Sequence, residues 1–144
     1  MIAVDTNILV YAHRIESPWH APAAVAVRDL AEDTAPWAIP WPCIHEFIGV
    51  VTNPRVFRTP TPLERALDDI EVWMESPSLR VIGESGAYWP HLREALVRGS
   101  VVGAVVHDAR IAAICKSHGV TALLTADRDF SRFPTVAVRN PLIR

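Results

Sequence analysis

Two acidic residues of this sequence lie in apolar stretches of helical period and have no basic residue at the neighbouring helical positions. In VVGAVVHDARIAAIC (101–115), the residues three and four positions from Asp108 are alanine, valine and isoleucine. In PCIHEFIGVV (42–51), the corresponding neighbours of Glu46 are proline, cysteine, glycine and valine. Either carboxylate can lie at the edge of its apolar face and reach solvent, or meet an arginine from elsewhere in the fold. If it is buried it needs a cation, because an unpaired buried charge costs several kcal/mol.

Three aspartates follow apolar, β-branched segments that are typical of strands. Asp5 comes directly after IAV, and Asp127 and Asp129 come after VTALL, in the segment TADRDF. The carboxyl ends of parallel strands are where α/β folds bind their ligands. Each of these residues can also serve as a helix N-cap or a turn residue. The spacing does not choose between Asp127 and Asp129.

Together these acids predict one acidic site at the carboxyl edge of a sheet. Carboxylates held close together repel one another and stay ionised by binding cations, and an all-oxygen ligand set favours Mg²⁺ or Mn²⁺. Such a site suits hydrolysis of phosphodiester bonds, in which the cation activates water and stabilises the departing oxygen. Zinc could draw on the Cys and His of CIH (43–45) and CKSH (115–118), but it is disfavoured because the one-residue gap in CIH is poor ligand spacing and both cysteines lie on apolar helix faces. A phosphatase with an aspartyl nucleophile is also disfavoured, because such enzymes typically have a second Asp where this chain has Asn7.

The segments that must position these acids alternate between short strands and longer helices, which indicates an α/β fold. We predict a single domain over residues 1–144, with a mostly parallel central sheet of about five strands flanked by helices. The strands are predicted at 2–4, 37–39, 79–82, 120–124 and 135–138. The proline-rich segment 54–62 is predicted to be a loop.

Two helices carry further expectations. The helix around Asp108 is predicted to have Ser100 as its N-cap and Gly119 just beyond its last turn. In the segment PLERALDDIEVWMES, four apolar residues share one helical face and are predicted to pack in the core. These residues are Leu63, Leu67, Ile70 and Met74.

Composition limits the classes of function. The formal net charge is −2, so any contact with nucleic acid has to be local. Two cysteines cannot form a disulfide framework, which fits a reducing compartment. The opening MIAVDTN lacks the basic segment of a signal peptide, and no apolar run approaches the roughly 20 residues of a membrane span. We therefore expect a cytoplasmic protein without a membrane segment.

The acids and their flanking segments resemble the motifs of PIN-domain ribonucleases, specifically the VapC toxins of bacterial toxin–antitoxin pairs. The resemblance rests on an ordered set of motifs: Asp5-Thr6-Asn7 after the first strand, Glu46, Asp108 in HDARIAAI, and TADRDF at 125–130. It extends over nearly the whole chain, including the closing FP and NPL that one bacterial subgroup shares. No acid of the set is missing.

The resemblance implies a role for each motif residue. The first Asp of the T-x-D-x-D-F motif belongs to the family's acidic site, so the Mg²⁺ or Mn²⁺ ligands are Asp5, Glu46, Asp108 and Asp127. Asp129 is then a neighbour with a structural role. Three further polar residues match positions that orient the carboxylates or water: Thr6, Asn7 and Thr125.

The resemblance also implies a substrate and partners. It implies endonucleolytic cleavage of a structured RNA, either tRNA or large ribosomal RNA, which leaves a 5′-phosphate and a 3′-hydroxyl. A VapB-type antitoxin and a homodimer are expected on the same grounds. Candidate phosphate contacts lie near the motifs or in loops: Arg14, Arg55, Arg58, Arg110, Arg128 and Arg132. The alternative function is a non-catalytic PIN-like module that binds metal or a protein partner for complex assembly, and RNA cleavage distinguishes the two.

Overall fold

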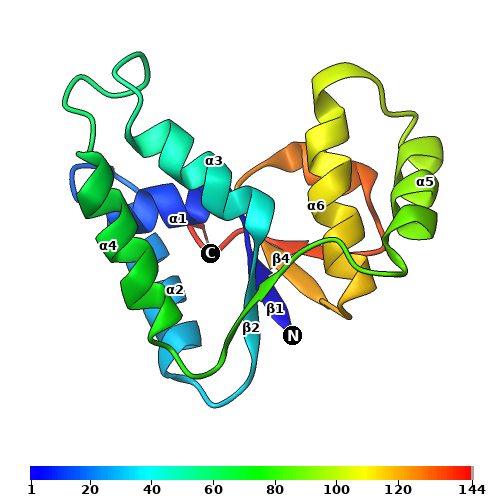
Figure 1. Cartoon of the computed structure of the whole chain (residues 1–144), viewed down its shortest axis with the longest axis horizontal. Helices are drawn as coiled ribbons and strands as arrows, with labels where there is room; N and C mark the ends of the chain where they lie inside the picture. The colour runs from blue at the N-terminus through cyan, green and yellow to red at the C-terminus, as the bar shows by residue number, and fades with distance from the viewer. Residues whose placement is uncertain (144) are drawn as a thin grey trace.

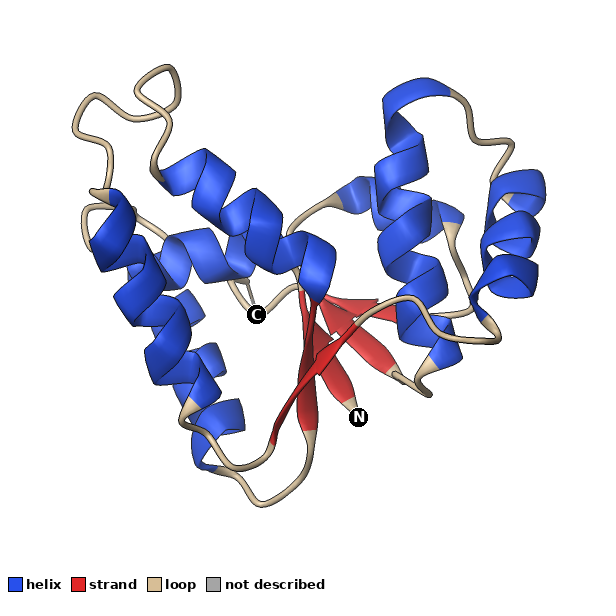
Figure 2. Cartoon of the chain, viewed as in Figure 1, coloured by secondary structure: helices blue, strands red, loops and turns tan. Residues whose placement is uncertain are grey.

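The structure is a computed structural model, and it describes residues 1–143. Five parallel strands form one sheet in the order β3-β2-β1-β4-β5 (Figures 1 and 2). The strands are β1 (Ile2–Val4), β2 (Trp37–Pro40), β3 (Leu79–Ile82), β4 (Ala122–Leu124) and β5 (Ala137–Arg139). The predicted α/β fold with a five-stranded parallel sheet is confirmed.

The central position of β1 explains where the site lies. The chain leaves β1 toward β2 on one side, and β4 and β5 lie on the other side of β1. A crevice forms at the carboxyl edge of a parallel sheet where the connections diverge in this way. Beyond the end of β1, the Asp5 amide donates a hydrogen bond to the Leu124 carbonyl at 3.0 Å. The residues that follow β1 and β4 are therefore fixed side by side.

Six helices flank the sheet in two groups that form the arms of a V (Figures 1 and 2). One arm contains α1 (Thr6–His13), α2 (His20–Glu32), α3 (Trp41–Val51) and α4 (Leu63–Met74). The other contains α5 (Tyr88–Arg98) and α6 (Val106–Ser117). The largest fully buried side chains of the core are Trp37 on β2 and Phe47 on α3. None of the helices within residues 1–143 has the length and apolar character needed to cross a membrane.

The ends of α6 differ in how well they were predicted. At its end the prediction is confirmed: Gly119 has a φ of +71°, and the Val120 amide donates to the Cys115 carbonyl at 3.0 Å, as in a Schellman cap. At its start the prediction is wrong, because Ser100 and Gly103 have positive φ angles and interrupt the helical path. A 3₁₀ turn at Gly103–Val105 follows, and α6 begins only at Val106. Asp108 therefore lies in the first turn of α6 and not in the middle of a helix.

The predicted apolar face of α4 is also mostly wrong. Of its four residues only Ile70 is buried, at 5% exposure. The others are exposed: Leu63, Leu67 and Met74. The buried residues of α4 are Ala66 and Ile70, and the helix packs against α3. The sequence periodicity shows which apolar residues share a face of α4. Packing against α3 decides which residues of the helix are buried.

Candidate metal centre

Asp5 is the most deeply buried acid of the site, with 4% of its surface exposed. It caps α1, because its Oδ1 accepts from the Thr6 amide at 2.8 Å. Its Oδ2 accepts from the Thr125 hydroxyl at 2.7 Å and from the Asn7 side-chain amide at 3.0 Å. The Cys43 thiol, at the start of α3, is 3.6 Å from Oδ1. Asp5 is thus both the predicted N-cap and a member of the acidic site.

A polar network joins the ends of β1 and β4 around this carboxylate. The Asn7 side chain donates to the Thr125 hydroxyl and accepts from the Ala126 amide, both at 3.0 Å. The Thr125 hydroxyl also accepts from the Asp127 amide at 3.0 Å. Asn7 and Thr125 therefore fix the start of the segment that carries Asp127.

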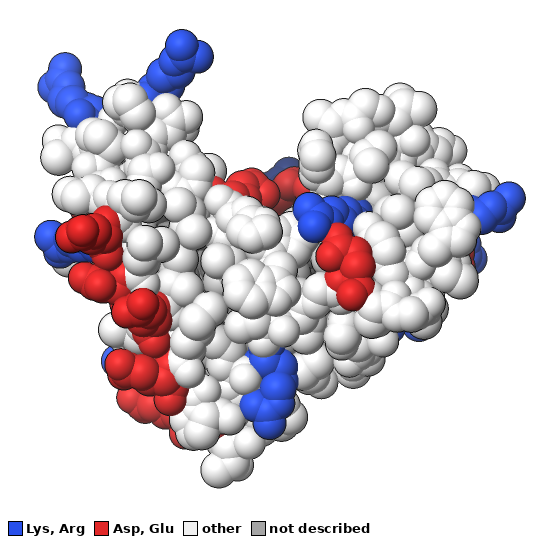
Figure 3. All heavy atoms as spheres, viewed as in Figure 1, with Lys and Arg blue, Asp and Glu red and all other residues white. Residues whose placement is uncertain are grey.

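The predicted acids converge from both arms of the V on the end of the sheet. A pocket of about 300 Å³ is lined by the four predicted ligands Asp5, Glu46, Asp108 and Asp127. Glu46 comes from α3 on one arm and Asp108 from α6 on the other. Figure 3 shows acidic side chains gathered at the floor of the notch between the arms.

Asp129 lies closer to this site than its expected structural role requires. Carboxylate oxygens of Asp108, Asp127 and Asp129 lie within 4.8 Å of one another, so these three could hold an ion together. Asp127 also caps the 3₁₀ turn Arg128–Arg132 by accepting from the Asp129 amide at 2.8 Å. Asp129 is exposed and does not line the pocket. Asp127 lines the pocket and Asp129 lies at its edge, so substitution of each aspartate alone distinguishes their roles.

Burial and mutual repulsion shift the titration of these acids in one direction. Burial raises the pKa of Asp5, and the hydrogen bonds from Thr125 and Thr6 offset only part of that effect. Partial burial and the Asp5 charge raise the pKa of Glu46. Partial burial, with the charges of the surrounding acids, raises the pKa of Asp108 to about 6. Burial is the largest cause of each shift, and the neighbouring carboxylate charges add to it in the same direction.

The pocket fits a divalent cation. Its polar ligands are carboxylate oxygens, the donor type that Mg²⁺ and Mn²⁺ prefer. The Thr6 hydroxyl lines the pocket, is buried, and has no hydrogen-bond partner within residues 1–143, although it lies near enough to Glu46 to favour that residue's charged form. A buried hydroxyl without a partner is uncommon, and a hydrated ion in the pocket would supply one.

The pocket has an apolar wall that the sequence did not reveal. Val10 and Tyr11 of α1, Val50 of α3, and Val56 and Phe57 of the following loop line the pocket beside the acids. The loop is the predicted proline-rich segment, but no local pattern indicates that it folds back over the site.

The six arginines predicted to contact phosphate fall into two groups. Arg14 and Arg110 are in ion pairs: Arg14 pairs with Glu16, and Arg110 pairs with Glu84 at 2.5 Å. The other four are exposed and pair with no carboxylate within residues 1–143: Arg55, Arg58, Arg128 and Arg132.

Comparison with known proteins identifies the class to which this fold and site belong. The sequence model of the PIN domain matches residues 2–136. VapC43, a ribonuclease of Mycobacterium tuberculosis, is 34% identical over 142 residues, which cover 99% of this chain and 96% of the relative. VapC48 of the same organism is 30% identical over 137 residues, 95% and 94% of the two chains. The chain therefore belongs to the PIN-domain family and, within it, to the VapC ribonucleases.

Solved structures agree on the fold. The toxin VapC20 of Mycobacterium tuberculosis superposes with a TM-score of 0.69 at 21% identity, over 97% of this chain and 100% of that one. The VapBC2 structure from Rickettsia felis superposes with a TM-score of 0.67 at 22% identity, over 97% and 98% of the chains.

Proposed function

We propose that this protein is a metal-dependent endoribonuclease, the toxin of a type II toxin–antitoxin pair. It would hydrolyse phosphodiester bonds in a structured RNA, and leave a 5′-phosphate and a 3′-hydroxyl. The observation that carries the proposal is the convergence of four carboxylates in one pocket, where burial and neighbouring charges raise the pKa of Asp5, Glu46 and Asp108 and a bound cation would offset the repulsion. Membership of the VapC ribonucleases supports the choice of RNA as substrate.

The residues divide the work between holding and orienting. Asp5, Glu46, Asp108 and Asp127 would hold Mg²⁺ or Mn²⁺, with Asp129 close by. When bound, the cation supplies Lewis-acid chemistry, which activates water and offsets charge on the departing oxygen.

The hydrogen bonds to Asp5 keep its carboxylate in one orientation before any ligand arrives. Thr125 and Asn7 provide two of these bonds, and they also set the backbone that carries Asp127. Val56 and Phe57 form an apolar side of the pocket, opposite in character to its carboxylates.

The substrate class and partners follow from the same family. VapC20 is described as a sarcin-ricin loop cleaving toxin, which favours ribosomal RNA, and tRNA is the second candidate. Structures of VapBC from Rickettsia felis and Salmonella typhimurium contain toxin and antitoxin bound to DNA, which supports a VapB-type antitoxin as the partner here. We also propose a homodimer that acts in the cytoplasm, where its RNA substrates are.

RNA cleavage tests the proposal directly. The antitoxin-free protein is incubated with total cellular RNA and Mg²⁺ or Mn²⁺, EDTA serves as a control, and the 5′ ends are mapped. We expect discrete, metal-dependent cuts that Asp108→Asn abolishes. Absence of cuts from the folded wild-type protein would favour a non-catalytic module that binds metal or a protein partner.

A matched pair of variants tests whether Asp127 or Asp129 is the metal ligand that follows β4. Asn at position 127 keeps an oxygen that can cap the 3₁₀ turn, so Asp127→Asn tests charge and ligation with little structural change. We expect Asp127→Asn to lower kcat/KM by more than about 100-fold and Asp129→Asn by less than about tenfold. The reverse order would make Asp129 the ligand.

A further inference from the structure

A second hollow lies on the other side of the loop that closes the metal pocket. It measures about 600 Å³ and is open, and its walls come from the end of α1, the start of α4 and the loop between α3 and α4. Val56 and Phe57 line both this hollow and the metal pocket. The two sites are therefore separated by the thickness of one loop, which we call the 52–62 loop.

Hydrogen bonds hold this loop in a defined position. The Thr61 amide donates to the Val51 carbonyl at 2.8 Å and closes the loop at its base. The Arg14 guanidinium donates to the Thr59 carbonyl at 2.9 Å and to the Thr61 hydroxyl at 3.2 Å. The Thr61 hydroxyl is 2.7 Å from His13 Nε2, and His13 Nδ1 is 2.5 Å from Asp69 on α4. Every donor in this chain of contacts has an acceptor when His13 is neutral and carries its proton on Nδ1.

Arg14 also supports the apolar side of the loop. Its guanidinium carbon lies 4.0 Å from the centre of the Phe57 ring, a stacking distance at which cation and ring attract each other. Its side chain is only 12% exposed. These contacts make Arg14 a positioning residue for the loop and remove it from the set of free phosphate contacts.

The charge of the outer hollow is opposite to that of the metal pocket. Its lining contains Arg14, Arg58 and Arg65 against Glu16. Glu16 pairs with Arg14, and within residues 1–143 no carboxylate forms an ion pair with Arg58 or Arg65. The hollow is thus a local basic site on a chain whose net charge is −2.

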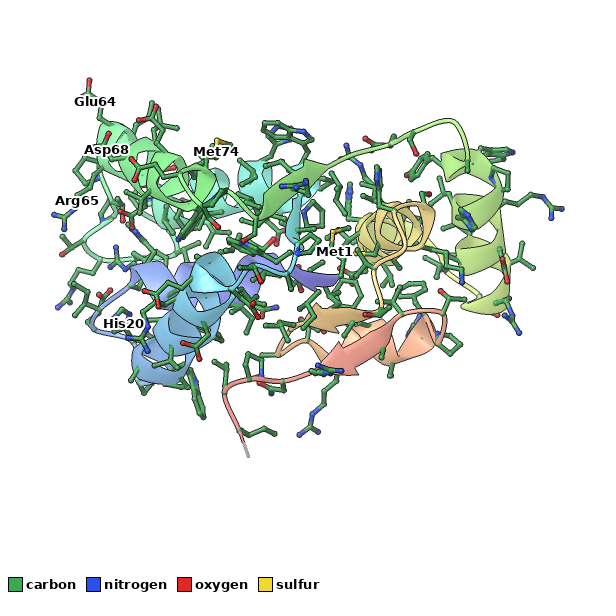
Figure 4. The ribbon with its side chains drawn as sticks, turned by 90° about the horizontal axis from the view of Figure 1, so that it is seen from below. Met1, His20, Glu64, Arg65, Asp68 and Met74 are labelled. Carbon is green, nitrogen blue, oxygen red and sulfur yellow. The ribbon has the colours of Figure 1, made fainter. Side chains whose placement is uncertain are left out.

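The figures show how this charge is placed. Basic side chains stand at the tip of the arm that carries the 52–62 loop, above the acidic floor of the notch (Figure 3). Arg65 extends from α4 away from Glu64, which points to another side of the helix (Figure 4). Arg65 lines the hollow, whereas Glu64 and Asp68 of the same helix are not among its lining residues.

We infer that the outer hollow is a second RNA-binding site, which takes the nucleotides next to the cut and binds two backbone phosphates, one with Arg58 and one with Arg65. The inference rests on the proposed function. A strand whose scissile phosphate sits among the acids must leave the pocket over its rim, and Val56 and Phe57 form part of that rim. Beyond it the hollow offers two unpaired guanidiniums for phosphate and the exposed side chain of Val56 for an unpaired base.

RNA is the occupant that this chemistry favours. A phosphodiester strand is polyanionic at every step, so it complements a basic hollow that continues from a site for phosphate chemistry. An acidic protein segment could use the same arginines, but the continuity with the metal pocket would then have no role. A protein occupant is therefore one of the outcomes that the test must separate.

The test measures RNA binding without cleavage. In the Asp108→Asn background, we compare Arg58→Ala/Arg65→Ala with the control Arg28→Ala/Arg93→Ala, which removes two exposed arginines from α2 and α5. The probe is a fluorescein-labelled RNA hairpin with an unpaired loop, and anisotropy gives Kd at several salt concentrations. Two lost phosphate contacts should weaken binding on the order of tenfold at low salt and reduce the log–log salt slope by about 1.4.

The outcomes separate this inference from the proposed function. If the Arg58→Ala/Arg65→Ala protein and the control bind the hairpin with equal Kd and slope, the hollow is not an RNA site. The same conclusion holds if Asp108→Asn alone does not bind the hairpin at low salt, or if the substitutions weaken binding of a copurifying protein partner and leave RNA binding unchanged. Failure of the proposed function is seen elsewhere, as the absence of cuts by the wild-type protein.

Discussion

At the residue scale, the Asp5 carboxylate is fixed by hydrogen bonds but remains electrostatically strained. Thr6, Asn7, Thr125 and Cys43 approach its two oxygens, yet its pKa is still raised by burial. Hydrogen bonds orient a carboxylate, whereas a cation is needed to balance several of them. The same logic applies to Asp108, whose pKa is raised by partial burial and by the charges of four neighbouring acids.

The titration of Asp108 predicts how the metal-free protein responds to pH. Its pKa rises from 3.8 to about 6 on folding, so the ionised form is disfavoured in the folded state. The contribution to stability is present below about pH 4 and is lost as pH rises through 6. In EDTA, the wild-type protein should be more stable in urea at pH 5 than at pH 7.

The Asp108→Asn variant isolates this effect from other titrating groups. It should be more stable than the wild type at pH 7 by about 1 kcal/mol, after allowance for the partial exposure of the side chain, and should show a smaller difference between the two pH values. A variant that is less stable than the wild type at pH 7, with the same pH dependence, would mean that Asp108 is not repelled by its neighbours.

At the scale of elements, the sequence predicts the type and order of the helices and strands better than the residues at which they begin and end. All five strands were predicted from short β-branched runs, with Asp5, Asp127 and Asp129 placed after strands and Glu46 and Asp108 placed on helices. The start of α6 was missed, because the positive φ angles at Ser100 and Gly103 depend on how the chain turns between α5 and α6. The proximity of Asp129 to Asp108 was missed for a similar reason, since it depends on the 3₁₀ turn after Asp127.

The position of the 52–62 loop is the feature of the fold that local sequence patterns specify least. Its prolines predict a loop, but its position is set by His13 at the end of α1, by Arg14 just after it and by Asp69 of α4. These contacts join residues 45 to 56 positions apart. No local periodicity reports them, so the apolar wall of the pocket becomes visible only in the folded chain.

At the same scale, the contacts of the Thr61 hydroxyl connect the 52–62 loop to the end of α1, and a substitution can test them. Thr61 is buried, and its hydroxyl lies between Arg14 and His13. Thr61→Val keeps the shape of the side chain but leaves two polar partners without it, which should lower the free energy of unfolding by about 1–3 kcal/mol in urea. Thr135→Val, at an exposed position, is the control and should change it by less than about 0.5 kcal/mol. Equal effects of the two substitutions would show that the hydrogen bonds of the Thr61 hydroxyl do not hold the loop.

At the scale of the whole molecule, the two arms of the V are joined through the sheet and face each other across the acids. Glu46 belongs to the arm of α3 and Asp108 to the arm of α6, and both line one pocket. The negative charge at the floor of the notch and the basic tip of one arm give the molecule a polarity that its net charge of −2 conceals (Figure 3). This polarity suits a substrate that is anionic along its length but must meet a cation at one point.

A cation held by both arms should stabilise the folded chain as a unit, because the unfolded chain does not bring Glu46 and Asp108 together. At a Mn²⁺ concentration 100 times the Kd, linkage gives about 2.7 kcal/mol of added stability, which appears as a rise in Tm that EDTA reverses. Asp108→Asn should lose most of this rise, whereas Glu71→Gln, on the exposed face of α4, should keep it. An equal rise in all three proteins would place the bound metal outside the pocket, and the carboxylates would then have to be explained as a site for a cationic partner.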